Sequence, residues 1–326
     1  MKKNYSLCMV FVCLSALVFS EENGTENSPW SFYTVTDFAY YPKTDYRDGC
    51  SHFSGIDGAY EKLECRITGF CEYKIPTPLG QHWLLKSASL IFCGGLEATP
   101  VSLRPMMSVK FIPLPFFAFS AGVSGGTGFN FGGFNGMKKL DDSSRELKSL
   151  SLLRHAYYDF WGKCVFMFDT GEIIKGDWTH VVFLADAQWI YKGISGVSDG
   201  TVWSWQNNNN NANGWQYEVS CILGYQMPLA LRMAGIMANF NAHLDSDDFG
   251  KYSKEGNYNG SFLYSNISAF CEVDFGKKDF AYIIIGFASR QSFKENHDDS
   301  VIEPYLASCG TEWFFSRFAV SLTHRF

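Results

Sequence analysis

Residues 312–326, E-W-F-F-S-R-F-A-V-S-L-T-H-R-F, decide the fold of this chain. On an extended backbone one face carries Phe314, Phe318, Val320, Leu322 and Phe326, and the other face carries Trp313, Arg317, Ser321, Thr323 and Arg325. Alternation with a period of two predicts one amphipathic β-strand that ends on an aromatic residue.

The same alternation recurs along the whole chain and predicts an all-β protein. The candidate strands are residues 30–41, 62–75, 83–96, 101–112, 116–131, 155–168, 180–191, 216–225, 229–240, 262–275, 280–293 and 312–326. No stretch has the roughly 18 consecutive apolar residues that a membrane-spanning helix requires.

Short and long connections alternate between these strands. Turns follow the second, fourth, eighth and tenth strands, and residues 169–178 follow the sixth. Longer links include 138–152, 196–214, 246–261 and 294–310, whereas the link after the third strand is a short exception. The pattern predicts a single antiparallel up-and-down barrel of about 12 strands, with 10 to 14 compatible, whose two ends lie on one side.

The start of the chain has the layout of a cleaved secretory signal. Lys2 and Lys3 precede an apolar run over residues 7–19, and a polar segment begins at Glu21. We therefore expect a signal peptide at 1–20, a short periplasmic segment at 21–29 and the barrel at 30–326.

These features resemble those of bacterial outer-membrane β-barrel proteins, without pointing to a subfamily. The resemblance implies an outer-membrane location, with lipid against the apolar faces of the strands. It also implies insertion by the barrel-assembly machinery, which would read Phe318, Val320, Leu322 and Phe326 as the assembly signal. His324 departs from the apolar residue that is usual third from the end.

The composition agrees with a membrane barrel. Aromatic residues make up 17% of the chain and charged residues only 18%, and the formal net charge is −6. Lipid-facing surface and aromatic girdles account for the aromatic content, and an acidic chain lacks the basic footprint of a nucleic-acid-binding protein. No cofactor and no metal site is predicted, since no Cys/His spacing suggests zinc. Cys50 and Cys309 are the one pair of cysteines worth testing for a disulfide.

Charged residues on the polar faces are expected to point into the lumen. The lumen or constriction candidates are Glu64, Arg66, Glu72, Lys74, Arg104, Lys110, Asp159, Lys163, Glu272, Asp274 and Arg317. In one interpretation they pair with each other within the wall. In the other, some of them form a constriction that selects solutes. The balance of signs predicts weak selectivity.

The predicted function is a narrow channel or transporter-like barrel for small solutes. The alternative is a surface adhesin or ligand-binding barrel that acts through its long loops; deleting residues 196–214 would then abolish binding but not insertion. A rim hydrolase is a third hypothesis, with His297-Asp298-Asp299 as its best cluster and Asp141-Asp142 and Asp247-Asp248 as further acidic pairs. No Gly-x-Ser-x-Gly motif occurs, and we expect no enzyme. A secreted β-sandwich would instead pack its apolar faces together.

Overall fold

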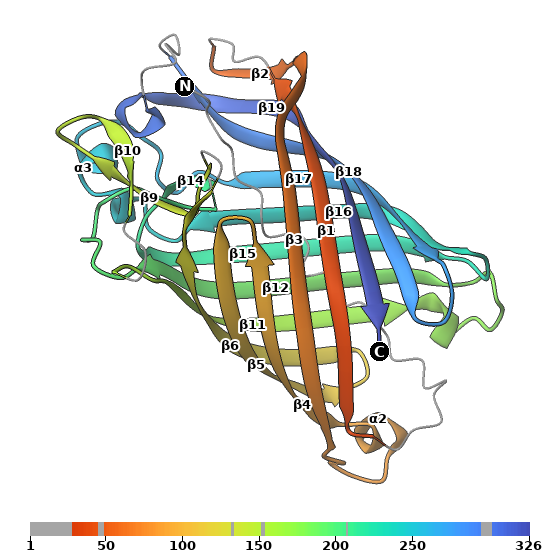
Figure 1. Cartoon of the computed structure of the whole chain (residues 1–326). Helices are drawn as coiled ribbons and strands as arrows, with labels where there is room; N and C mark the ends of the chain where they lie inside the picture. The colour runs from red at the N-terminus through yellow and green to blue at the C-terminus, as the bar shows by residue number, and fades with distance from the viewer. Residues whose placement is uncertain (1–27, 45–48, 132–133, 151–153, 207, 295–301) are drawn as a thin grey trace.

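The computed structural model describes residues 28–44, 49–131, 134–150, 154–206, 208–294 and 302–326. These residues form one closed antiparallel barrel, as predicted (Figure 1). The expected signal segment 1–20 and most of 21–29 lie outside the described residues. None of the described helices is long and apolar enough to cross a bilayer.

The barrel wall contains twelve strands among the described residues, so the predicted count is confirmed. They are β1 (Trp30–Thr44), β3 (Ile56–Pro76), β4 (Ser89–Thr99), β5 (Ser102–Leu114), β6 (Phe117–Gly128), β11 (Tyr157–Asp169), β12 (Val181–Ile194), β15 (Gly214–Gln226), β16 (Leu231–His243), β17 (Tyr264–Asp274), β18 (Asp279–Phe293) and β19 (Ser308–Arg325). Each strand pairs with the next, and β1 closes the barrel against β19, from Tyr33↔Arg325 to Tyr40↔Phe318.

The third predicted strand was wrong at its start. Residues Trp83–Lys86 form a short helix, α2, and β4 begins only at Ser89. The His82 side chain caps this helix by accepting a hydrogen bond from the backbone N–H of Leu84 at 3.4 Å. This local capping outweighs the weak strand pattern of the segment. The connection between β3 and β4 is therefore longer than the predicted turn.

The two ends of the barrel differ in the size of their connections. At the turn end, where β1 begins and β19 ends, the links are short apart from α2 and the η1 segment (Thr170–Glu172). At the loop end lie β2 (Ser51–Ser54), β7 (Asn130–Phe131), β8 (Phe134–Asn135), β9 (Met137–Asp141), β10 (Glu146–Ser149), β13 (Trp203–Trp205), β14 (Asn208–Asn211), η2 (Ser246–Phe249), α3 (Lys251–Lys254) and η3 (Glu303–Tyr305). Figure 1 shows β9, β10 and α3 at the opposite end from α2.

The loop end carries an ordered structure that we call the loop cap. It comprises the four-stranded sheet β10-β9-β13-β14 together with η2, α3 and η3. Its apolar core combines residues from four separate connections, among them Leu140, Val202, Tyr252 and Leu306. The loops therefore pack on each other instead of extending separately into solvent.

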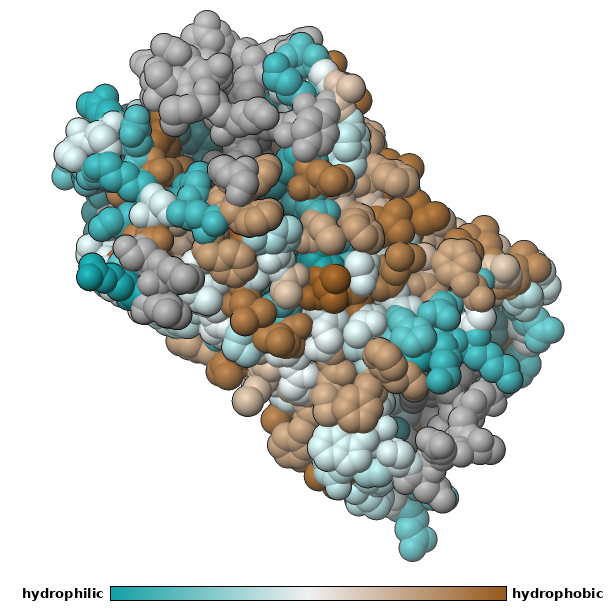
Figure 2. Space-filling model, viewed as in Figure 1, coloured by the Kyte–Doolittle hydropathy of each residue, from teal (hydrophilic) through white to brown (hydrophobic). Residues whose placement is uncertain are grey.

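The outer surface of the barrel is apolar. Every wall strand exposes at least one large hydrophobic side chain: Phe38, Leu63, Phe92, Met107, Phe119, Phe160, Phe183, Leu223, Ile236, Ile267, Ile285 and Phe318. No second sheet covers these residues, which rules out the β-sandwich alternative for the described chain. In Figure 2 hydrophobic side chains spread over the strands, while hydrophilic ones gather over β10 and α3. Such an exterior is suited to contact with hydrocarbon.

The final strand follows the predicted alternation except at one bulge. The pairing of β19 with β18 shifts between Arg317↔Gly286 and Phe315↔Phe287. The extra residue reverses the phase of the preceding segment, as bulges do. Phe314 is consequently buried on the inner side, so its predicted place on the outer face was wrong. Phe318, Leu322 and Phe326 are exposed as predicted, at 42%, 41% and 70%.

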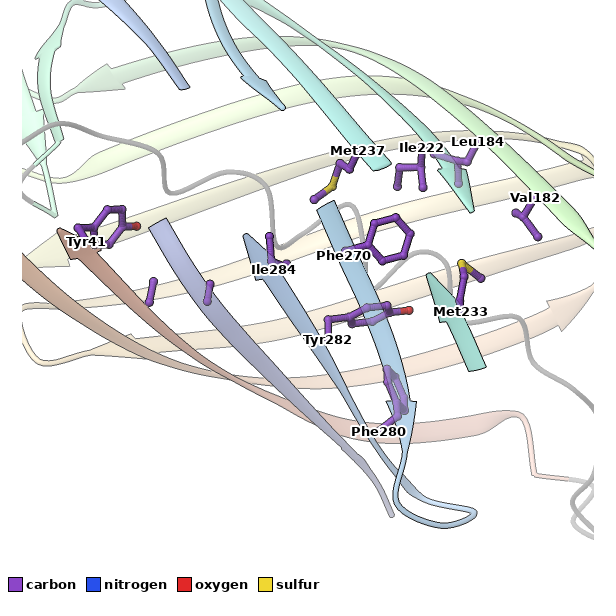
Figure 3. Close-up of a cluster of buried hydrophobic side chains, with 12 residues drawn as sticks. Tyr41, Val182, Leu184, Ile222, Met233, Met237, Phe270, Phe280, Tyr282 and Ile284 are labelled. Carbon is purple, nitrogen blue, oxygen red and sulfur yellow. The ribbon is translucent and has the colours of Figure 1, made fainter. Parts of the chain in front are cut away.

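One side of the barrel interior is packed with apolar side chains. Val182, Leu184, Ile222, Met237 and Ile284 are at most 2% exposed and form one cluster with neighbours from β1 and β15 to β19. Figure 3 shows this cluster, including Phe270 and Tyr282, between the ribbons of the wall. The sequence pattern predicts a polar interior, and on this side that expectation was wrong.

Candidate functional site: the barrel lumen

The open part of the lumen lies off-centre. A cavity of about 1110 Å³ runs along the strands from Trp30 and Phe326 at the turn end to Asn211 and Glu303 at the loop end. Among the wall strands, β3, β4, β5, β6, β11 and β12 contribute more of its lining residues than β1 and β15 to β19 do. The packed cluster lies beside this cavity, and two of its members, Tyr41 and Leu184, also line it.

Charged residues line this cavity with an excess of basic groups among the described residues. The basic ones are Arg66, Lys74, Arg104, Lys110, Lys163, Lys192, Arg290 and Arg325. The acidic ones are Glu72, Asp159, Glu218 and Glu303. The cavity surface is therefore richer in positive than in negative side chains.

Three of the lysines share one row of paired residues across five strands. Lys74 pairs with Ile91, Ile91 with Lys110, Lys110 with Ser120, and Ser120 with Lys163. All five residues line the cavity. Because adjacent strands are about 4.8 Å apart, successive lysines of this row are anchored roughly 10 Å apart. We call Lys74, Lys110 and Lys163 the lysine row.

A chain of ion pairs crosses the wall nearer the loop end. Arg66 pairs with Asp37 at 2.8 Å and with Glu97 at 3.5 Å, and Arg104 pairs with Glu97 at 2.9 Å. Asp159 continues the chain 3.7 Å from Arg104. Asp37, Glu97 and Asp159 are at most 5% exposed, which agrees with the rule that buried charges are paired.

The loop cap is attached to this network through Gln206. Its side-chain amide donates to Glu97 Oε1 and to Ser102 Oγ, each at 2.8 Å. The preceding Trp203 and Trp205 are buried and pack beside Tyr157 of the wall. The connection between β12 and β15 therefore folds over the lumen and is fixed to β4 and β5.

A second junction between cap and lumen surrounds His243. Its Nδ1 lies 2.8 Å from Asp248, and its Nε2 lies 3.1 Å from Asn211 and 2.9 Å from Gln216. Both ring nitrogens are thus engaged by side chains. A His–carboxylate pair is found in many hydrolases, but here the imidazole lacks a nucleophile among these contacts.

The predicted lumen candidates divide into two groups. Those that line the cavity are Arg66, Glu72, Lys74, Arg104, Lys110, Asp159 and Lys163. Those that do not line it are Glu64, Glu272, Asp274 and Arg317. Glu64 accepts from Tyr41 at 2.8 Å and pairs with Lys62, Glu272 lies 3.5 Å from Arg232, and Arg317 is fully buried.

Several residues that line the cavity or belong to the polar network in its wall fell outside the candidate set. Two of them, Lys192 and Glu97, each lie one residue beyond the end of a predicted strand. A third, Gln206, lies in the predicted loop 196–214. Arg290 pairs with Glu312 and donates to Thr44 at 3.1 Å. Extending the polar face of each strand by one or two residues would have found Glu97 and Lys192, but Gln206 could be found only from the fold of the cap.

The residues considered for hydrolysis have structural partners. Asp141 pairs with Lys148, and Asp142 lies 2.7 Å from Lys251. Asp247 lies 3.2 Å from Lys254. His297-Asp298-Asp299 lies outside the described residues. Within the described residues no group of three His, Cys, Asp or Glu side chains is placed to hold a metal ion.

The described cysteines are free. Cys65, Cys71, Cys164, Cys221 and Cys271 are partly exposed on strands of the wall. Cys93 differs from them because it lines the cavity. Cys50 and Cys309 lie in contact at the loop end.

Comparison with solved structures finds bacterial outer-membrane β-barrels at low similarity. No protein-family model matches the chain, and no curated protein is significantly similar to it in sequence. The β domain of the Bordetella autotransporter BrkA is 9% identical, with a TM-score of 0.47, and the match covers 91% of this chain and 99% of that one. An outer membrane channel from Pseudomonas putida F1 is 10% identical, with a TM-score of 0.39 and coverage of 95% and 100%. The translocator domain of the autotransporter NalP from Neisseria meningitidis is 9% identical, with a TM-score of 0.39 and coverage of 94% and 90%. Similarities this low carry no information about a substrate; in architecture the chain resembles bacterial outer-membrane β-barrels.

Proposed function

We propose that the protein is an outer-membrane channel that conducts small solutes through one off-centre, charged pathway. The turn end faces the periplasm and the loop cap faces the outside. Residues 1–20 act as the export signal, and the strand that carries Phe318, Val320, Leu322 and Phe326 is read by the barrel-assembly machinery.

The observation that supports a channel is the cavity that reaches from one end of the barrel to the other. A barrel that served only as an anchor would not require an open, charged cavity beside the packed apolar cluster in its interior. Charged groups around a passage favour hydrated solutes, and a twelve-stranded barrel has a modest lumen between filled eight-stranded barrels and wide porins.

Planar-bilayer recording on the purified protein tests the proposal. We expect discrete conductance steps, and a flat baseline under varied voltage would contradict them. Cys93 provides an internal control because its thiol lines the pathway. Small water-soluble methanethiosulfonates should lower the conductance of the wild type and leave the Cys93→Ser variant unaffected.

A ligand-binding role of the loops has its own support in the ordered loop cap. Deletion of residues 196–214 is a poor test of this role, because the deletion also removes Trp203, Trp205 and the Gln206 anchor. Substitutions of exposed cap residues such as Lys148 and Lys254 test binding without disturbing the core. Loss of ligand binding in such variants, with unchanged conductance, would favour the second role.

A further inference from the structure

We infer that the pathway favours anions, and that the lysine row is a binding site for a small anionic solute during its passage. This inference rests on the proposed channel function and names the class of solute, which is a small molecule with carboxylate, phosphate or sulfate groups.

The first argument is the separation of charge between the cavity surface and the wall. Basic side chains outnumber acidic ones on the surface by eight to four. Several carboxylates that pair with these basic groups do not line the cavity and are at most 5% exposed. They are Asp37, Glu97, Asp186 and Glu312. A solute in the cavity therefore approaches cationic groups more closely than it approaches their partners, and electrostatic attraction depends on that distance.

The second argument concerns the ion-pair partners of the three lysines in the row. Lys163 lies 3.0 Å from Asp186. For Lys74 and Lys110, in contrast, the described residues offer no ion pair within 4 Å. Glu72 attracts Lys110 at longer range, but it already accepts a hydrogen bond from Tyr33 at 3.1 Å. Each free ammonium group can donate three hydrogen bonds to an anion.

The spacing of the row suits transport better than permanent capture. Binding sites along a channel must be strong enough to admit a solute and weak enough to release it. Single ammonium groups roughly 10 Å apart act as separate point charges. They lack the bidentate geometry with which paired guanidinium groups hold an oxyanion tightly.

The main test is the reversal potential of the channel under a potassium chloride gradient. We expect the sign of an anion-selective pore, with a selectivity that falls as the ionic strength rises. Lys74→Gln and Lys110→Gln should each lower the chloride-to-potassium permeability ratio by roughly two- to fivefold. Lys175→Gln is the matched control, because Lys175 is an exposed lysine in the turn before β12, and it should leave the ratio unchanged.

A second measurement tests whether the cavity attracts anions, and it does not depend on recording a current. Cys93 pairs with Ser108, and two positions along the same two strands Ile91 pairs with Lys110. A negatively charged methanethiosulfonate should therefore modify Cys93 several-fold faster than a positively charged one of similar size. Mass spectrometry gives both rates, and Lys110→Gln should reduce their ratio if it folds; heat-modifiable gel migration checks the folding.

The two measurements separate failure of the inference from failure of the channel proposal. A cation-selective reversal potential, or equal modification rates with both reagents, overturns the inference even if conductance is normal. A silent bilayer overturns the proposed function, and faster modification by the anionic reagent would then still support an anion-binding lumen.

Discussion

Glu97 is the residue on which most of the polar wall network converges. Its carboxylate pairs with Arg104 at 2.9 Å and with Arg66 at 3.5 Å, and it accepts a hydrogen bond from the Gln206 amide at 2.8 Å. The residue is 2% exposed. Glu97→Gln keeps the shape of this buried side chain but leaves Arg66 and Arg104 without their shared carboxylate. We expect the free energy of unfolding to fall by roughly 3–5 kcal/mol, as for other broken buried pairs.

The loss should be visible as a lower temperature of the folded-to-unfolded shift in heat-modifiable gels, with urea unfolding in detergent as a second readout. Glu146→Gln is the control, because Glu146 is exposed on β10. This surface change should alter the free energy of unfolding by no more than about 0.5 kcal/mol. Equal stabilities of the two variants would show that the network contributes little.

Asp142 gives the loop cap a dependence on pH. Burial raises the pKa of its carboxyl group, but hydrogen bonds from Lys251, Tyr252 and Tyr305 outweigh burial and lower this pKa below its ordinary value. A carboxyl whose pKa is lowered by folding stabilises the fold above its unfolded pKa of about 3.9, and this stabilisation is lost as pH falls through the folded pKa. Cap stability should therefore be constant near neutral pH and decline below about pH 4.

Pepsin cleavage of the cap, compared between wild type and Asp142→Asn at each pH, measures this effect. The comparison cancels the pH dependence of pepsin and of Asp141, whose pKa is lowered to about 2 by its hydrogen bond with Lys148. The variant should be cleaved faster than wild type at pH 5, and the difference should vanish toward pH 2. A constant ratio across this range would assign the pH dependence to other groups.

At the scale of elements, β2 is the least firmly attached strand of the main sheet. Within the described part of the chain it pairs with β19 alone, in parallel, from Ser51↔Thr311 to Ser54↔Phe314. Cys50 directly precedes the paired Ser51, Cys309 lies two residues before the paired Thr311, and the two thiols are in contact. A disulfide between them would close a loop of most of the chain and favour the paired arrangement.

Mild oxidation of the unmodified protein should therefore remove the mass of two hydrogen atoms and join the peptides that contain Cys50 and Cys309. Cys309→Ser should abolish this change, whereas Cys271→Ser should not, because Cys271 lies in the middle of β17. A bridge that instead involves Cys271 would contradict this placement of β2.

Strand alternation predicted the elements well where one face meets a uniform apolar environment, as in β12 and β15. It failed where a single local feature intervened. The capping of α2 delayed β4 to Ser89, and the bulge before Arg317 moved Phe314 to the interior. Neither feature changes the average hydrophobicity of its segment, so a pattern-based argument could not detect it.

At the scale of the whole molecule, strand alternation does not show how the interior is divided. Met237 and Ile284 belong to strands with apolar residues on both faces, and only the closed wall shows that they pack into one cluster. The lysine row likewise depends on the register of β3, β5 and β11, which no single strand reveals. The balanced count of charges therefore predicted weak selectivity, whereas their positions favour anions.

This division of the interior predicts different effects of substitution on the two sides. Ser120→Trp places a large side chain in the pathway between Lys110 and Lys163, and we expect it to reduce single-channel conductance severalfold while the barrel stays folded. Met237→Ala removes a fully buried side chain from the packed side. It should lower the free energy of unfolding by roughly 2–5 kcal/mol and leave conductance nearly unchanged. Bilayer recordings and heat-modifiable gels on both variants measure the two effects separately. An increase in conductance for Met237→Ala with none lost for Ser120→Trp would place the pathway on the opposite side of the lumen.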